Sequence, residues 1–145
     1  MPRKPLLSDP ADLSRVAEAV GRAEQGSAGE VRVQLEPRCA GDPLDRAREL
    51  FAALGMEGTE RGTGVLLYAA PEDRKAAVFA GEGLFGAAEP GFWDGVLDAL
   101  AEGAAAGSLA DGLVAALDRI GGLLRARFPA QDGAGNELPD AVEGA

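Results

Sequence analysis

The sequence has no histidine and a single cysteine, Cys39, among its 145 residues. Without histidine there is no Ser-His-Asp or Cys-His pair, no imidazole metal ligand and no imidazole proton shuttle near neutral pH. One cysteine excludes an internal disulfide and any zinc site built on two or more thiolates. Catalysis and metal binding that require these residue types are therefore excluded for this chain.

Positive charge is also scarce. Lysine and arginine number 14 against 24 aspartates and glutamates, which gives a formal net charge of −10. This charge opposes binding to a phosphate backbone, and we expect no nucleic-acid partner. Carboxylates are the main chemical resource that remains, and they favour a hard cation as the charged ligand.

Long apolar runs are missing as well. The first one, Leu6-Leu7, ends at Ser8-Asp9, whereas a secretory signal needs roughly 7–15 apolar residues. No stretch approaches the roughly 18–20 apolar residues that span a bilayer. We therefore expect a cytoplasmic protein without membrane insertion, and we expect it to be a monomer.

Hydrophobic periodicity divides the chain into helices and strands. Residues 30–36 alternate between apolar and polar, which is typical of a half-buried strand, and residues 65–70 are apolar throughout, which indicates a strand covered on both faces. A short polar turn at 71–74 leads to a third strand over 75–80. Four segments have helical spacing: from Pro10 to about Gly26, from Pro43 to Gly55, over about 90–102, and from Ser108 to about 124.

The order αβαββαα predicts one α/β domain with αβα layers and a small mixed sheet over residues 9–128. The first two strands should be parallel because a helix connects them. The third should run antiparallel to the second because its link is so short. Residues 129–145 lack any period and are predicted to form an acidic, flexible tail.

This topology brings three glycine-bearing turns to one end of the sheet, at 27–30, 61–64 and 81–83. Glycine-rich backbone beside carboxylates offers the oxygen ligands that a hard cation needs. Glu30 and Glu82 are the best candidate ligands, with Asp94 third. The plain alternative is that the glycines only make turns and the carboxylates are solvated.

Arg61 lies in the second of these turns. It is suited to a structural ion pair with Glu30 or Glu82, or to holding an anionic ligand such as phosphate. Residues 81–86 also match the dinucleotide pattern G-x-G-x-x-G. That pattern belongs after the first strand of a βαβ unit and opens a helix at once. Here it follows an antiparallel strand and we expect the next helix several residues later, so no dinucleotide site is predicted.

At these same segments the sequence resembles the TPM domain family. The resemblance extends from about Leu13 to Asp140 and is carried by Ser27-Ala28-Gly29-Glu30-Val31-Arg32-Val33, Asp42-Pro43-Leu44-Asp45-Arg46-Ala47, Arg61-Gly62-Thr63-Gly64-Val65-Leu66-Leu67-Tyr68, Gly81-Glu82-Gly83-Leu84 and Gly91-Phe92-Trp93. It implies a compact αβα fold with functional positions at Glu30, Arg61 and Glu82. Relatives have been linked to calcium binding, to acid phosphatase activity and to partnership with membrane proteins. The family often has Asp where this chain has Glu82.

The leading hypothesis is a TPM-like domain that binds a divalent cation, Ca²⁺, through Glu30, Glu82 and neighbouring carbonyls. One alternative is a weak metal-assisted acid phosphatase in which Arg61 steadies the phosphate. Another is a protein-interaction module that has no ligand of its own and contacts an unidentified partner through the acidic tail.

Overall fold

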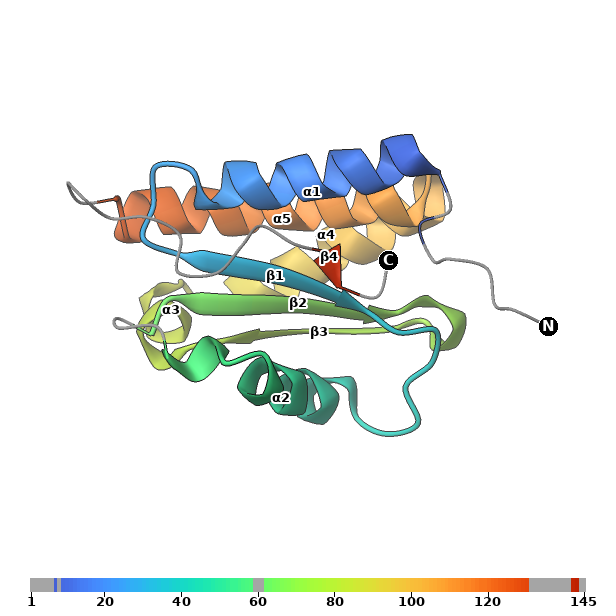
Figure 1. Cartoon of the computed structure of the whole chain (residues 1–145), viewed down its shortest axis with the longest axis horizontal. Coiled ribbons are helices and arrows are strands. Elements are labelled where there is room, and N and C mark those ends of the chain that lie inside the picture. Colours follow the sequence, from blue (N-terminus) through green and yellow to red (C-terminus); the bar gives the residue numbers. More distant parts are fainter. Residues whose placement is uncertain (1–6, 8, 59–61, 131–141, 144–145) are drawn as a thin grey trace.

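The structure is a computed structural model that describes residues 7, 9–58, 62–130 and 142–143. It has a mixed α/β fold, as the sequence predicts (Figure 1). The elements are, in order, α1 (Pro10–Glu24), β1 (Glu30–Leu35), α2 (Pro43–Ala53), η1 (Met56–Gly58), β2 (Gly64–Ala70), η2 (Pro71–Asp73), β3 (Lys75–Ala80), α3 (Glu82–Ala87), α4 (Phe92–Ala106), α5 (Leu109–Arg127) and β4 (Val142–Glu143). Among these elements no helix is both long and apolar enough to cross a membrane.

The sheet has the order β3-β2-β1-β4. β1 and β2 are parallel, with Glu30 opposite Gly64 and Leu35 opposite Ala69. β3 runs antiparallel to β2. Both orientations agree with the sequence prediction, because α2 carries the chain back to the same end of the sheet while the short η2 turn can only reverse it.

Side-chain caps begin three of the helices. The Asp9 carboxylate accepts a hydrogen bond from the Ala11 N–H at 2.8 Å, and the Asp42 carboxylate accepts one from the Leu44 N–H at 2.7 Å. The Ser108 hydroxyl accepts one from the Asp111 N–H at 3.1 Å. Each bond satisfies an amide that has no partner within its helix, which is why these sequence signals locate the helix starts well.

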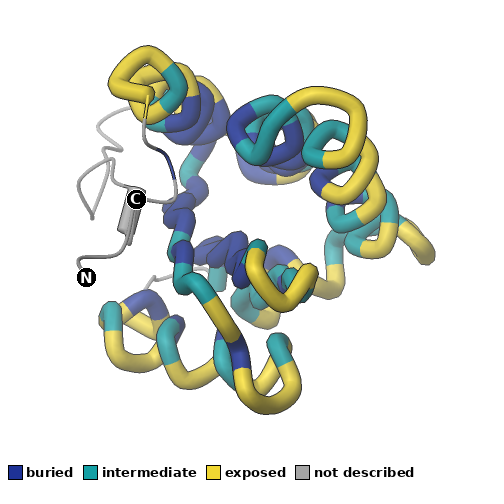
Figure 2. Tube along the Cα trace, turned by 90° about the vertical axis from the view of Figure 1, so that its right-hand side faces the viewer, coloured by how far each residue is buried: buried dark blue, intermediate teal, exposed yellow. Residues whose placement is uncertain are grey.

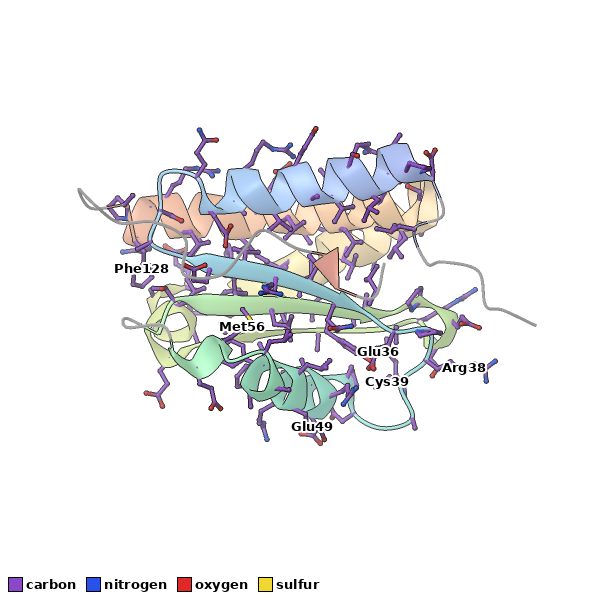
Figure 3. The ribbon with its side chains drawn as sticks, in the orientation of Figure 1. Glu36, Arg38, Cys39, Glu49, Met56 and Phe128 are labelled. Carbon is purple, nitrogen blue, oxygen red and sulfur yellow. The ribbon has the colours of Figure 1, made fainter. Side chains whose placement is uncertain are left out.

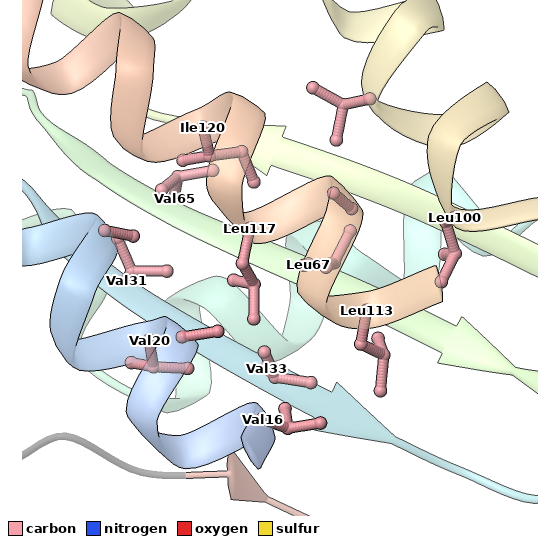
Figure 4. Packing of buried hydrophobic residues seen from close by; sticks show 14 of the residues in the cluster. Val16, Val20, Val31, Val33, Val65, Leu67, Leu100, Leu113, Leu117 and Ile120 are labelled. Atoms are coloured by element: carbon pink, nitrogen blue, oxygen red, sulfur yellow. The ribbon is translucent and has the colours of Figure 1, made fainter. Parts of the chain in front are cut away.

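All seven residues of β2 are buried, and their side chains alternate between two hydrophobic clusters. Val65 and Leu67 face α1, α4 and α5, where Val20, Leu113, Leu117 and Ile120 also lie (Figure 4). Leu66 and Tyr68 face the opposite side, toward α2 and η1. Helices therefore cover both faces of the central strand, and their outward sides are exposed (Figure 2).

Three elements have no counterpart in the sequence prediction: the short 3₁₀ turn η1, α3 and β4. α3 has only six residues, two of them glycines, so neither its length nor its helix propensity marks it. The expectation that the next helix begins several residues after Gly81 is wrong, because α3 begins at Glu82. β4 has two residues and pairs parallel with Val33 and Gln34 of β1, and two residues are too few to reveal a strand period.

The start of the segment predicted to be a tail is attached to the α1–β1 turn. Ser27 and Pro129 form an isolated antiparallel bridge, and the Ala130 N–H donates to the Gly26 carbonyl at 3.0 Å. Most of the remaining tail, 131–141 and 144–145, lies outside the described residues. The division at residue 128 stays a prediction.

A polar cluster fastens α2 to the sheet. The Arg46 guanidinium makes two hydrogen bonds to the Glu36 carboxylate, at 2.7 and 2.8 Å, and the Tyr68 hydroxyl donates to the same carboxylate at 2.8 Å. These donors, Arg46 first, hold the pKa of Glu36 below its usual value. Burial and the adjacent carboxylate raise the pKa of Tyr68, so this phenol stays protonated.

We predict that Glu36→Gln lowers the free energy of unfolding by about 1–3 kcal/mol at pH 7, because it removes a charge-assisted pair that is partly shielded from solvent. A carboxylate with a lowered folded pKa stabilises the fold above its unfolded pKa, and this stability is lost as pH falls through the folded pKa. The difference between the two proteins should therefore shrink below about pH 4 in urea unfolding.

Glu49→Gln is the matched control for this prediction. Glu49 accepts a hydrogen bond from the same arginine at 3.1 Å, but its side chain is 68% exposed. It should change stability little. If Glu36→Gln lowers the free energy of unfolding equally at pH 3 and pH 7, then Glu36 stabilises the fold through packing and not through its charge.

Candidate functional site

The three glycine-bearing turns meet at one end of the sheet. The Glu30 N–H donates to the Thr63 carbonyl at 3.3 Å, and the Thr63 hydroxyl donates to the Ala28 carbonyl at 3.0 Å. The Gly81 N–H donates to the Gly64 carbonyl at 2.8 Å. Segments that lie far apart in the sequence are thus joined through their main chains, as the topology predicts.

Gly62 and Gly81 make the closest backbone approach at this end. A Cβ atom on Gly81 would lie 2.5 Å from the Gly62 carbonyl oxygen, and one on Gly62 would lie 2.8 Å from the Gly83 nitrogen. Gly62 also has a φ of +65°, which side-chain-bearing residues rarely adopt. The Leu84 N–H donates to the Gly62 carbonyl at 3.0 Å, so the first turn of α3 is held against this loop.

Glu30 is the first residue of β1 and is only 2% exposed. A buried carboxylate is costly unless donors or cations compensate its charge, and Glu30 is not an isolated charge. It stands on the α2 side of the sheet, because the alternate residues Val31, Val33 and Leu35 belong to the opposite core. Of the candidate ligands, Glu30 is therefore the one that the fold holds most firmly.

A second buried carboxylate, Glu24, accepts a hydrogen bond from the main chain of β1. It is 3% exposed at the end of α1, and its Oε2 accepts the Val31 N–H at 2.8 Å. The amides of Glu30 and Glu36 donate toward β2, so the amide of Val31 points to the other edge of β1. Glu24 satisfies an edge amide in this way, and sequence periodicity does not predict that role.

The other candidates differ from Glu30 in exposure. Glu82 is exposed as the first residue of α3, and Asp94 is exposed in the first turn of α4. Arg61 lies outside the described residues, so its predicted ion pair or anion contact stays a prediction. Within the part of the chain that the structure describes, no three acidic or cysteine side chains are gathered as a metal-binding group. Glu30, Glu82 and Asp94 thus do not form a three-carboxylate centre.

Three aromatic rings gather where α3 meets the start of α4. Phe85 of α3 stacks parallel to Trp93 of α4 at a centroid distance of 6.3 Å, and Phe92 meets Trp93 edge-on at 4.9 Å. The spacing of Phe92 and Trp93 predicts core positions, and both pack at the margin of the core. Phe85, however, is 62% exposed. Sequence periodicity does not predict this exposed ring, because α3 itself was not predicted.

The opposite end of the sheet is fixed by polar contacts. Figure 3 shows Glu36 and Cys39 there, far from Phe128 and Met56 at the glycine-rich end. The Lys75 ammonium donates to the carbonyls of Cys39 and Gly41 at 2.8 and 3.0 Å. The sequence contains one sign of the cluster formed by Glu36, Arg46 and Tyr68 at this end. Tyr68 stands in an otherwise apolar buried strand, and its hydroxyl needs a hydrogen-bond partner.

A family model for the TPM domain matches residues 6–123. The chain belongs to the TPM domain family. The match covers α1 through most of α5, including both ends of the sheet. Comparison with curated proteins finds no match.

Solved structures of bacterial proteins have the same fold. The BA42 protein from the psychrophilic bacterium Bizionia argentinensis is 30% identical, with 93% of each chain covered and a TM-score of 0.84. The N-terminal domain of a protein from P. gingivalis is 18% identical, with 83% of this chain and 78% of that chain covered and a TM-score of 0.68. The N-terminal domain of the cg2496 protein from Corynebacterium glutamicum is 14% identical, with 92% and 78% covered and a TM-score of 0.62. The last two show the likeness of fold alone.

We predict that Gly81→Ala destabilises this TPM domain by about 1–3 kcal/mol, because the new methyl group overlaps the Gly62 main chain. Gly86→Ala is the control. It adds the same methyl group within α3, where nothing lies within 4 Å. This change should be neutral or slightly stabilising, because alanine favours helix.

Urea unfolding of both variants measures the difference. Amide spectra of Gly81→Ala should shift around Gly62 and Gly64, whose carbonyls accept hydrogen bonds from the 81–84 turn, and around Glu30, whose N–H donates to the neighbouring Thr63 carbonyl. Equal stability of the two variants would contradict the close packing of these turns.

Proposed function

We propose that this TPM domain binds a divalent cation, with Ca²⁺ as the favoured ion, at the glycine-rich end of its sheet. The observation that carries the proposal is the meeting of three turns there, with Glu30 held at the start of β1 and Glu82 at the start of α3. The carbonyls of Gly62, Thr63 and Gly64 lie at this end; each accepts one main-chain hydrogen bond and has a second lone pair that a cation can use.

The residues present fit a weak oxygen site better than a tight one. Ca²⁺ takes about 6–8 oxygen ligands from carboxylates, carbonyls and water. Glu30 and Glu82 would supply carboxylates, and carbonyls and water would supply the rest, because the described residues gather no third acidic side chain. Few charged ligands and an exposed Glu82 favour a dissociation constant of roughly 10⁻⁴–10⁻³ M.

The charge of the whole chain supports cation binding. A formal charge of −10 raises the concentration of divalent cations near the surface and disfavours anions. The glutamate at position 82 keeps an oxygen ligand, although its longer side chain reaches further from the backbone than the aspartate common in the family.

A titration with Ca²⁺ and Mg²⁺, followed by amide chemical shifts and calorimetry, tests the proposal. Shifts are expected first in 27–31, 62–65 and 81–84, with Ca²⁺ favoured because a flexible site suits its irregular coordination. Glu82→Gln should weaken Ca²⁺ binding by about tenfold, since it removes one of few charged ligands. Because Glu82 is exposed, this variant should keep its fold.

Glu18→Gln is the matched control. Glu18 is exposed on α1, and its substitution changes the net charge by the same amount away from the candidate site. Binding should be unchanged in this variant. Equal weakening in both variants would reduce the effect to general electrostatics, and no shift at millimolar Ca²⁺ would overturn the proposal.

The same protein separates binding from the phosphatase alternative. Hydrolysis of a generic phosphomonoester that needs the divalent ion and is lost in both Glu82→Gln and Arg61→Ala would add catalysis to the site. Activity that is indifferent to both changes would come from a contaminant. Ion binding without turnover would support a binding domain alone.

A further inference from the structure

The outer edge of β3 is open. β3 is the terminal strand of the sheet, and its register with β2 pairs Ala77 with Tyr68 and Phe79 with Leu66. The Gly81 N–H donates to the Gly64 carbonyl. Because main-chain groups alternate in direction along an antiparallel strand, those of Lys75, Ala77 and Phe79 also point toward β2. The amides and carbonyls of Ala76, Val78 and Ala80 therefore point outward. No hydrogen bond joins them to another described residue.

A groove lies beside this edge, between the sheet and α4. Its volume is about 620 Å³, and its lining is mostly apolar. Ala69 and Ala76 form its floor on the sheet, and the α4 wall consists of Leu97, Leu100, Ala101, Ala104 and Ala105. Small side chains on both walls leave this space, whereas the larger residues farther along β2 and α5 fill theirs.

The surface next to the groove is strongly acidic. From residue 76 to residue 118 the chain has seven acidic residues and no lysine or arginine. Three of them, Asp94, Asp98 and Glu102, recur every four residues along α4 and are all exposed. We call these three residues the α4 stripe. Like charges at this spacing destabilise a helix, and no described cation forms an ion pair with any of the three, although the Arg119 guanidinium comes near Gly95.

We propose that β3 and α4 form a docking site for an extended, basic segment of a partner protein. Such a segment would add a strand to the open edge of β3, which supplies main-chain hydrogen bonds. Alternate side chains of the added strand point to opposite faces, so those on the same face as Ala76 point toward α4. Of these, apolar side chains would enter the groove, and lysine or arginine side chains would neutralise the α4 stripe. The site is distinct from the glycine-rich end and does not depend on cation binding there.

The charges favour this occupant over the alternatives. A second copy of the chain pairing edge to edge would bring two α4 stripes together, and like charges oppose that contact. An acidic segment would be repelled in the same way. Arg74 and Lys75 line the groove at the β2–β3 turn, where β3 begins, so the cations of the partner should lie toward α4 and away from this turn.

The first probe is a Lys-Val octapeptide in which serine alternates with valine and lysine (Ser-Val-Ser-Lys-Ser-Val-Ser-Lys), so that valine and lysine share one face of the strand. It is added to the full chain and followed by amide chemical shifts. We expect the largest shifts at Ala76, Val78 and Ala80 and along the groove wall of α4. A Glu-Val peptide tests the charge requirement, and a Lys-Ser peptide tests the apolar requirement. Both should bind at least about tenfold more weakly, because the Glu-Val peptide lacks the positive charges and the Lys-Ser peptide lacks the apolar side chains.

Two groups of variants separate docking from general attraction. Asp98→Asn/Glu102→Gln removes two charges from the stripe and should weaken the Lys-Val peptide by about fivefold or more. Glu18→Gln/Glu57→Gln removes the same charge from exposed positions elsewhere and should have little effect. Ala101→Leu and, separately, Ala105→Leu fill the groove from exposed positions and should weaken binding while the unfolding free energy is kept.

The proposal is overturned if the Lys-Ser peptide binds as well as the Lys-Val peptide, or if the two double variants lose binding equally. It is also overturned if the shifts avoid Ala76, Val78 and Ala80, or if neither groove-filling variant weakens binding. Peptide binding that persists when Glu82→Gln has lost its Ca²⁺ response would separate this site from the proposed cation site.

Discussion

The burial of β2 on both faces is the constraint on which the rest of the fold depends. A strand whose seven residues are all buried needs cover on two sides, and a single helical layer leaves half of its apolar area in water. The crossover helix α2 supplies one cover and the helices α1, α4 and α5 supply the other. Each fully buried leucine or valine contributes roughly 1.5–3 kcal/mol relative to exposure, so an uncovered face would cost much of a domain's net stability.

The same constraint explains what can be predicted from the sequence. The all-apolar run at 65–70 and the alternation at 30–36 are direct consequences of burial on two faces and on one, so both strands and their relative direction are predictable. Caps such as Asp9, Asp42 and Ser108 add local chemistry at the helix starts. α3 and β4 escape prediction because they are too short to display a period, and only tertiary contacts stabilise them.

The candidate site is predictable in part for a similar reason. The turns at 27–30 and 81–83 lie at the same end of the sheet because β1 and β2 are parallel and β3 runs antiparallel to β2, and these directions are predictable from the sequence. Side-chain exposure does not follow from topology. Glu30 is buried and Glu82 is exposed, although both come directly beside a glycine in the sequence. The difference arises because Glu30 lies within a paired strand, whereas Glu82 begins a short helix at the surface.

The two ends of the sheet are stabilised by different physical means, and this difference bears on where ligands can act. At one end, Glu36, Arg46 and Tyr68 satisfy one another's charges and hydrogen bonds, so a charged ligand there would have to break strong contacts. At the other end, glycine main chains pack closely and the carbonyls of Gly62, Thr63 and Gly64 join the turns through hydrogen bonds, while the Glu82 side chain is exposed. The negative charge of the α4 stripe, which forms no ion pair with a described cation, is a third case, because it is fixed to a helix and stands beside an apolar groove. A partner can neutralise that charge without disturbing the core, which makes the β3–α4 surface suited to reversible association.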